Sequence, residues 1–133
     1  AAPRGMFAHV KEAIRRCYSA GFRKHEVAIV SYHGREQSQL LTIDRLGQTS
    51  LRHFTGEYDL FGQPVYTPGD VLVESVYRFK GQAAPAVILT EIDFDVLDDK
   101  AARKLFVGAT RSAMKLVLIL HQKSAARLLE RLG

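Results

Sequence analysis

Short, almost wholly apolar segments that alternate with stretches of helical periodicity constrain the fold more than any other feature of this chain. Four such segments lie at residues 27–32, 71–76, 85–90 and 115–121. Consecutive apolar and β-branched residues indicate strands that are buried on both faces. Buried strands that alternate with helices are typical of a parallel sheet between helical layers. We therefore predict a three-layer α/β fold with a largely parallel central sheet.

The intervening stretches predict the helices and loops. Apolar residues recur at helical spacing over 7–20, before Gly21, and we expect further helices at 37–46, before Gly47, and after Asp98. Asp98 is placed to cap a helix whose apolar face carries Ala102, Leu105, Phe106 and Ala109, and Ser124 to cap a final helix. Residues 51–55 fit a strand, and the Gly- and Pro-rich residues 56–70 predict a loop or small hairpin insertion.

The composition fits one folded domain with an anionic partner. The chain has 133 residues, 47% of them hydrophobic and 25% charged, which argues against disorder. Its 19 Lys and Arg residues exceed its 14 Asp and Glu residues, and a net charge of +5 suits nucleic acid or nucleotide. Cys17 is the only cysteine, so no intramolecular disulfide forms, which fits a reducing cytoplasm. The apolar segments are too short to span a membrane.

Residues 75–82 (SVYRFKGQ) lie between two predicted buried strands, where ligands of parallel sheets bind. They combine two cations, two aromatic rings and a glycine. Cations in such a turn can contact phosphate, and aromatic rings can stack on bases. The same composition also fits a solvated loop whose rings enter the core.

Two arginines occupy similar positions. Arg111 ends the segment 105–111 (LFVGATR), where it could stabilise a transferring phosphoryl group or only complement a helix dipole. Arg35 follows the strand at 27–32 and could contact phosphate or form a surface salt bridge. The scattered histidines show no metal-ligand spacing, and Asp93, Asp95, Asp98 and Asp99 are better explained by a helix N-terminus, so we expect no metal held by this chain. No GxxxxGK[ST] phosphate-binding loop is present.

Three segments, in order, resemble the motifs of superfamily 1 DNA helicases of the UvrD/Rep type. Residues 27–38 (VAIVSYHGREQS) resemble motif IV, residues 71–89 (VLVESVYRFKGQAAPAVIL) motif V, and residues 104–111 (KLFVGATR) motif VI. The resemblance extends from Phe7 onward. It implies the second, C-terminal RecA-like domain of an ATP-dependent helicase, expected to be a fragment of a longer chain.

The resemblance also implies roles for individual residues. Arg111 matches an arginine finger directed at the γ-phosphate of ATP, and Arg35 a second arginine with the same target. Tyr32 matches the aromatic residue that lies against adenine. The remaining matched positions divide into the nucleotide contacts Gly81, Gln82 and Thr110 and the single-stranded DNA contacts Ser75, Tyr77, Arg78 and Lys80.

The sequence also departs from the family pattern. Ala83 stands where the family usually has a Glu near the ribose, and Tyr77 replaces a usual His. Residues 56–70 are too few for the accessory domain that most UvrD-type helicases insert here, which resembles a compact branch.

The P-loop and the Mg²⁺ ligands for ATP would then lie on an N-terminal RecA-like domain, and this chain alone should hydrolyse no ATP. The main alternative is an inactive nucleic-acid-binding or regulatory module that kept the fold, with Ala83 as its support. A third reading is an unrelated α/β domain whose motif matches are accidental.

Overall fold

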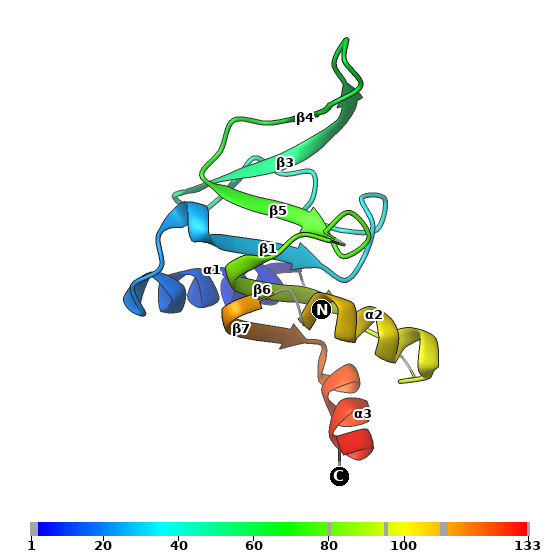
Figure 1. The fold of residues 1–133 in the computed structure, drawn as a ribbon. Helices are drawn as coiled ribbons and strands as arrows, with labels where there is room; N and C mark the ends of the chain where they lie inside the picture. Colours follow the sequence, from blue (N-terminus) through cyan, green and yellow to red (C-terminus); the bar gives the residue numbers. More distant parts are fainter. Residues whose placement is uncertain (1–2, 80, 95, 110–111, 133) are drawn as a thin grey trace.

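The computed structural model describes residues 3–79, 81–94, 96–109 and 112–132. Among these residues, seven strands form one sheet, and helices cover both of its faces (Figure 1). Six strands follow the order β2-β3-β5-β1-β6-β7, and β4 pairs with β3. This arrangement confirms the predicted α/β class and is compatible with a RecA-like domain.

The core of the sheet is parallel. Strand β1 (Val27–Ser31) lies between β5 (Val71–Ser75) and β6 (Ala84–Ile92). Strand β7 (Ser112–Leu120) pairs with β6, and the first part of β3 (Thr49–Tyr58) pairs with β5, both in parallel. The predicted strands are confirmed, although β3, β6 and β7 are longer than their apolar segments.

Alternate residues of β1 enter two different cores, as the pleat of a strand requires. Val27 and Ile29 join the core under helix α1 (Pro3–Ser19). Ala28 and Val30 join the opposite core, which includes Ala101 and Leu105 of helix α2 (Asp99–Ala109) and is flanked by Leu128 of helix α3 (Gln122–Leu132). The predicted three layers are therefore present.

Helix α1 forms over the predicted residues, but it begins at Pro3, four residues earlier than predicted. Its buried stripe recurs every three or four residues: Val10, Ala13, Ile14 and Cys17. The helix closes because the Gly21 amide donates to the carbonyl of Tyr18 and the Phe22 amide to that of Cys17, at 3.0 and 3.1 Å. This closure needs a left-handed residue, and Gly21 supplies it with φ of 100°.

The prediction of a helix at 37–46 is wrong. Residues 35–44 form turns, followed by the short strand β2 (Arg45–Leu46), which pairs antiparallel with β3. The amides of Leu40 and Leu41 donate to Ser38 Oγ, both at 3.1 Å, and not to carbonyls one helical turn back. Serine side chains compete for backbone partners in this way and so disfavour helix. The apolar periodicity reflected Leu40, Leu41 and Leu46, which cover the α1 side of the sheet.

Residues 56–70 contain a hairpin that projects from the sheet (Figure 1). Strand β3 runs beyond its parallel part and pairs antiparallel with β4 (Pro64–Tyr66). Asp59 closes the turn, because its Oδ1 accepts the amides of Phe61 and Gln63 at 2.8 and 3.0 Å. The turn leaves Leu60 and Phe61 exposed, at 100% and 87%.

The N-termini of the last two helices differ from each other. Asp98 caps α2 as predicted, with its Oδ1 accepting the Ala101 amide at 2.8 Å. Ser124 was predicted to cap the final helix, but α3 begins at Gln122, so Ser124 lies inside its first turn. Its buried hydroxyl donates instead to the carbonyl of Phe94 at 2.9 Å. None of the helices in the described part of the chain is long and apolar enough to cross a membrane.

Candidate functional site at the carboxyl edge of the sheet

Strands β1, β5 and β6 end at the same edge of the sheet, because they are parallel and adjacent. The segments that follow them are residues 32–44, 76–83 and 93–98. Most of the residues singled out in the sequence lie in or beside the first two segments. Loops at the carboxyl ends of parallel strands are the usual ligand-binding position of α/β sheets.

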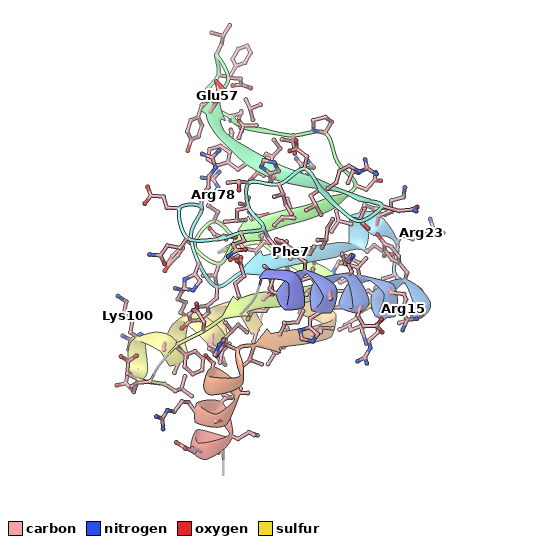
Figure 2. All side chains as sticks on the ribbon, turned by 180° about the vertical axis from the view of Figure 1, so that it is seen from behind. Phe7, Arg15, Arg23, Glu57, Arg78 and Lys100 are labelled. Atoms are coloured by element: carbon pink, nitrogen blue, oxygen red, sulfur yellow. The ribbon has the colours of Figure 1, made fainter. Side chains whose placement is uncertain are left out.

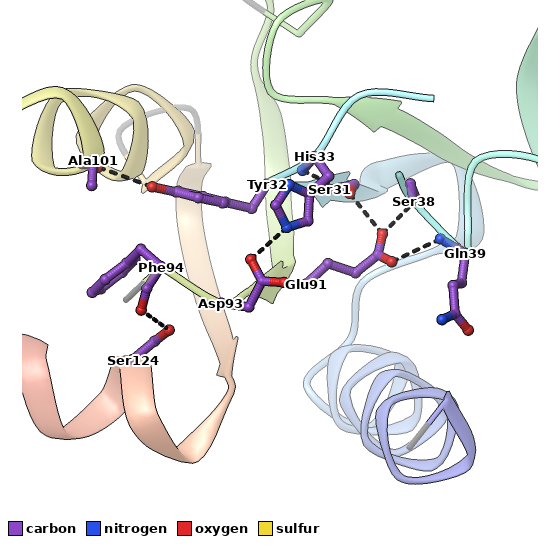
Figure 3. A network of polar contacts seen from close by, with 10 residues as sticks. All are labelled: Ser31, Tyr32, His33, Ser38, Gln39, Glu91, Asp93, Phe94, Ala101 and Ser124. Atoms are coloured by element: carbon purple, nitrogen blue, oxygen red, sulfur yellow. Dashed lines mark hydrogen bonds and ion pairs between the residues drawn. The ribbon is translucent and has the colours of Figure 1, made fainter. Parts of the chain in front are cut away.

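Glu91 ties the loop after β1 to the end of β6 (Figure 3). Its Oε1 accepts the hydroxyls of Ser31 and Ser38 at 2.6 and 2.5 Å, and its Oε2 accepts the Gln39 amide at 2.8 Å. The Glu91 backbone has φ of 60°, in the left-handed region that non-glycine residues rarely adopt. These three bonds hold the loop on both sides of Arg35.

A second tie joins the same segments. His33 Nε2 contacts Asp93 Oδ1, and the His33 amide donates to Ser31 Oγ at 3.1 Å. Figure 3 shows His33 and Glu91 on neighbouring parts of this edge. The acidic residue Asp93, which was expected to serve a helix N-terminus, instead fixes the loop after β1.

Arg35 lies on the base of the hairpin. Its Nη2 donates to the carbonyl of Thr55 at 2.9 Å, and a Cβ at Gly56 would lie 2.4 Å from its Nη1. The side chain is exposed, and no carboxylate of the described residues pairs with it. A guanidinium has five N–H donors, so Arg35 keeps donors for an anionic ligand.

Tyr32 lies in the core. The residue is 4% exposed, its ring lies 6.1 Å from that of Phe94, and its hydroxyl donates to the carbonyl of Ala101 at 3.4 Å. Burial raises the pKa of Tyr32 to about 12. Lys104 Nζ also lies over the ring, 4.1 Å from its centroid. Adenine could stack on Tyr32 only after these neighbours had moved.

Tyr77 is the accessible aromatic residue at this edge, with 54% of its surface exposed. The same Lys104 Nζ lies 4.7 Å from its ring centroid, so one cation bridges Tyr32 and Tyr77. A Cβ at Gly34 would lie 3.9 Å from the Tyr77 ring, which places the two loops in contact. Tyr77 thus presents a ring to solvent beside a cation, an arrangement suited to a base.

Arg78, predicted to contact DNA, belongs largely to a buried polar cluster. Its Nε lies 3.5 Å from Oε1 of Glu74, which is 2% exposed, and its Cζ lies 3.8 Å from the centroid of the Phe54 ring. The Tyr66 hydroxyl donates to Oε2 of the same Glu74. Arg78 therefore connects the turn after β5 to both strands of the hairpin. Figure 2 labels it at the base of the hairpin, below Glu57.

The remaining matched residues have distinct surroundings. Ser75 is buried, and its Oγ accepts the Arg78 amide at 3.1 Å. Gly81 has φ of 79°, a left-handed conformation that glycine adopts without strain. Gln82 Nε2 donates to the Arg78 carbonyl at 3.0 Å. The predicted residues Lys80, Thr110 and Arg111 lie outside the described residues.

The cavity among the described residues of this edge is too small to enclose a nucleotide. A cavity of about 40 Å³ is lined by Arg35, Leu41, Phe54, Glu74, Ser75 and Arg78. A space of this size holds about one water molecule. ATP would therefore have to lie outside this cavity, against exposed groups such as Arg35.

Sequence reasoning missed three residues that organise this edge. Glu91 and Glu74 are carboxylates in or beside apolar segments, and a charge at such a position is itself a signal, because buried charges require partners. Lys104 lies within the 104–111 segment, but its place between two rings depends on the tertiary fold.

Comparison with known proteins agrees with this architecture. Residues 70–119 match the family of UvrD-like helicase C-terminal domains. The matched range contains both the 71–89 and the 104–111 segments, and it excludes residues 27–38. No curated protein matches the chain. The family match supports a C-terminal domain of the UvrD/Rep type in this part of the chain.

Proposed function

We propose, on the premise of a UvrD-like helicase C-terminal domain, that this chain is the second motor domain of an ATP-dependent DNA helicase or translocase. The observation that carries the proposal is the family match over residues 70–119, which covers two segments expected at the ATP and DNA contacts. The open carboxyl edge supports it, because Arg35 has no carboxylate partner among the described residues and Tyr77 presents an exposed ring.

The proposal requires a partner domain. The phosphate-binding loop and the Mg²⁺ ligands would come from an N-terminal RecA-like domain of the same protein, and ATP would lie between the two. Bound Mg²⁺–ATP would supply the phosphoryl group that is transferred to water. Arg111 and Arg35 would approach the γ-phosphate when the domains close, and their charges would stabilise the transition state.

Single-stranded DNA would bind at the same carboxyl edge of the sheet. Tyr77 is the residue we assign to a base of single-stranded DNA, with Lys80 beside the backbone. Ser75 is buried and would act indirectly, by holding the turn through its bond with the Arg78 amide. Gly81, Gln82 and Thr110 would lie by the nucleotide. Tyr32 would contact adenine only if domain closure exposed its ring. While it stays buried, its role would be to hold Lys104 at this edge. Arg78 would transmit movement between the turn after β5 and the hairpin, since it contacts both.

Two finer features belong to the same proposal. The hairpin at 56–70 would occupy the place where larger helicases insert an accessory domain, which would put the protein in a compact branch of the family. We also place the complete protein in the cytoplasm, where a lone buried Cys17 stays reduced.

The decisive experiment measures DNA-stimulated ATP hydrolysis by the complete protein with Arg111→Ala. We expect the rate to fall by a factor of roughly a thousand or more, as for arginine fingers elsewhere. Arg103→Ala is the matched control, because Arg103 is an exposed arginine on α2, close to Arg111 in sequence. An Arg111→Ala protein that hydrolyses ATP at the wild-type rate would refute the arginine-finger role of Arg111.

A second function, an inactive nucleic-acid-binding or regulatory module, is favoured by one observation. Ala83 is exposed and stands where the family usually has Glu. Under this alternative, the complete protein binds DNA but shows no DNA-dependent ATP hydrolysis. The same measurement on the wild-type protein separates the two functions.

A further inference from the structure

A second concave surface lies at the opposite, amino-terminal edge of the sheet. Helix α1 ends there, and β3 and β5 begin there. The ends of these elements and the turn before β1 frame a cavity of about 580 Å³. Its lining includes Tyr18, Phe22, Arg23, Lys24, Thr49 and Asp70. The volume is in the range of pockets that bind small organic groups. Figure 2 shows Arg23 at the far side of the sheet from Arg78 and Lys100.

Two aromatic rings form one part of this cavity, and both are held in place. Tyr18 lies in the last turn of α1 and is 39% exposed, and burial raises the pKa of its hydroxyl. Phe22 follows Gly21 in the closing turn of α1 and packs against the core. The cavity thus offers a fixed, partly exposed aromatic ring with an apolar floor.

Cations form the other part. The Arg23 backbone is fixed, because its amide donates to Glu26 Oε1 at 2.9 Å, but no carboxylate in the described part of the chain pairs with its exposed guanidinium. Lys24 differs, since its Nζ lies 3.2 Å from Asp70 Oδ2, and the hydrogen bond from Lys24 lowers the pKa of Asp70. Among the described lysine and arginine side chains that line the cavity, Arg23 is therefore the one without a carboxylate partner.

We infer that this cavity binds one nucleotide of single-stranded nucleic acid, with the base on Tyr18 and the phosphate on Arg23. A guanidinium can donate two parallel hydrogen bonds to phosphate, and a base face stacks on an aromatic ring without regard to sequence. The strand must be single, because bases in a duplex are already stacked on each other. The inference extends the proposed function to a second contact, on the edge opposite the motor residues, and does not depend on ATP hydrolysis.

The test measures binding of a fluorescent oligothymidylate by anisotropy at low salt. We expect Tyr18→Ala and Arg23→Ala each to weaken binding about tenfold, the value of one stacked base or one lost phosphate contact. Arg23→Ala should also reduce the slope of log affinity against log salt by about 0.7. Tyr18→Phe keeps the ring and should bind as the wild type does, which separates stacking from a folding defect.

Arg16→Ala is the matched control, because it removes the same charge from an exposed position of α1 outside the cavity lining. We expect it to leave binding within about twofold of wild type, since Arg16 does not line the cavity and already pairs with Glu12. An equal loss in Arg16→Ala and Arg23→Ala would overturn the inference, and so would wild-type binding by Tyr18→Ala.

Two further results would also overturn it: no binding by the wild-type chain, or displacement of the oligonucleotide by an equal concentration of free thymidine monophosphate. The second result would indicate a mononucleotide site. Failure of this inference is distinct from failure of the motor proposal. The motor proposal is tested by DNA-stimulated ATP hydrolysis of the wild-type and Arg111→Ala proteins, and this inference by oligonucleotide binding. A Tyr77→Ala protein tests binding at the carboxyl edge in the same assay.

Discussion

Glu91 shows how much a single residue can contribute to the shape of the candidate site. It combines an unfavourable backbone conformation, φ of 60°, with three hydrogen bonds that hold the loop after β1. A left-handed conformation costs a non-glycine residue about 1–2 kcal/mol. The side-chain bonds to the loop offset this cost, so the backbone and the side chain act in opposite directions on stability.

Two substitutions at this position separate the two effects. Glu91→Ala and Glu91→Gly both remove the carboxylate, but only glycine adopts the left-handed conformation without strain. We expect both variants to be less stable than wild type, and Glu91→Gly to be more stable than Glu91→Ala by about 1 kcal/mol. Urea unfolding followed by circular dichroism measures the difference, and a more stable alanine variant would contradict the prediction.

The sequence indicated which residues lie near the carboxyl edge, because strand ends can be located from apolar segments. It could not indicate which side chains face solvent there. Tyr32 and Tyr77 both follow apolar strands, yet the first is 4% and the second 54% exposed. The difference depends on helix α2, whose Lys104 and Ala101 cover Tyr32, and these residues are distant in sequence.

At the scale of elements, the segment between β4 and β5 packs directly on β3. Thr67 exchanges backbone and side-chain hydrogen bonds with His53, and the Asp70 amide donates to the Ser50 carbonyl at 3.1 Å. Gly69 lies so close that a Cβ there would be 2.4 Å from the Leu51 carbonyl carbon and oxygen and 2.6 Å from the Arg52 nitrogen. These neighbours are backbone atoms of a paired strand and cannot rotate away.

We therefore expect Gly69→Ala to destabilise the protein by about 2 kcal/mol, because it forces β3 and this segment apart. Gly5→Ala is the control, since Gly5 is an exposed residue of α1 and an added methyl group would have no neighbouring atom within 4 Å. Alanine favours helix over glycine by about 0.5–1 kcal/mol, so the control should be as stable as wild type or more so. Thermal unfolding of both variants checks the pair, and equal destabilisation would contradict it.

Elements with strong periodicity were predicted well, and elements defined by distant partners were not. The strands at 27–32 and 85–90 and the first helix follow from apolar pattern alone. The stretch 37–46 carries leucines at helical spacing but folds as turns, because Ser38 and Glu91 take up its amides. Strands β2 and β4 have two and three residues, too few for any periodicity.

At the scale of the whole molecule, stability should fall in strongly alkaline solution. The pKa of Tyr32 is raised to about 12 by burial, and those of Tyr18 and Tyr66 are also raised, mainly by burial. Well below pH 10 all three phenols are neutral in the folded and unfolded chains. Between about pH 10 and about pH 12 the unfolded chain loses protons that the folded chain retains, so unfolding becomes more favourable as pH rises.

We expect the free energy of unfolding to be lower at about pH 11 than at about pH 9, and Tyr32→Phe to reduce that decrease. Tyr58→Phe is the matched control, because it removes the hydroxyl of an exposed tyrosine, 58% exposed at the hairpin. Urea titrations of each protein at both pH values give the differences needed. A Tyr32→Phe protein with the full wild-type decrease would show that this buried phenol does not couple folding to pH.

The central position of β1 has a consequence for the order in which the chain can assemble. Ala28 pairs with Leu72 on one side and with Val87 on the other. The strand that is synthesised first therefore pairs with two strands that are synthesised much later. Contacts between residues far apart in sequence form slowly, and an unpaired apolar strand favours aggregation until they do. During synthesis, β1 must therefore keep at least one edge unpaired until β6 has left the ribosome.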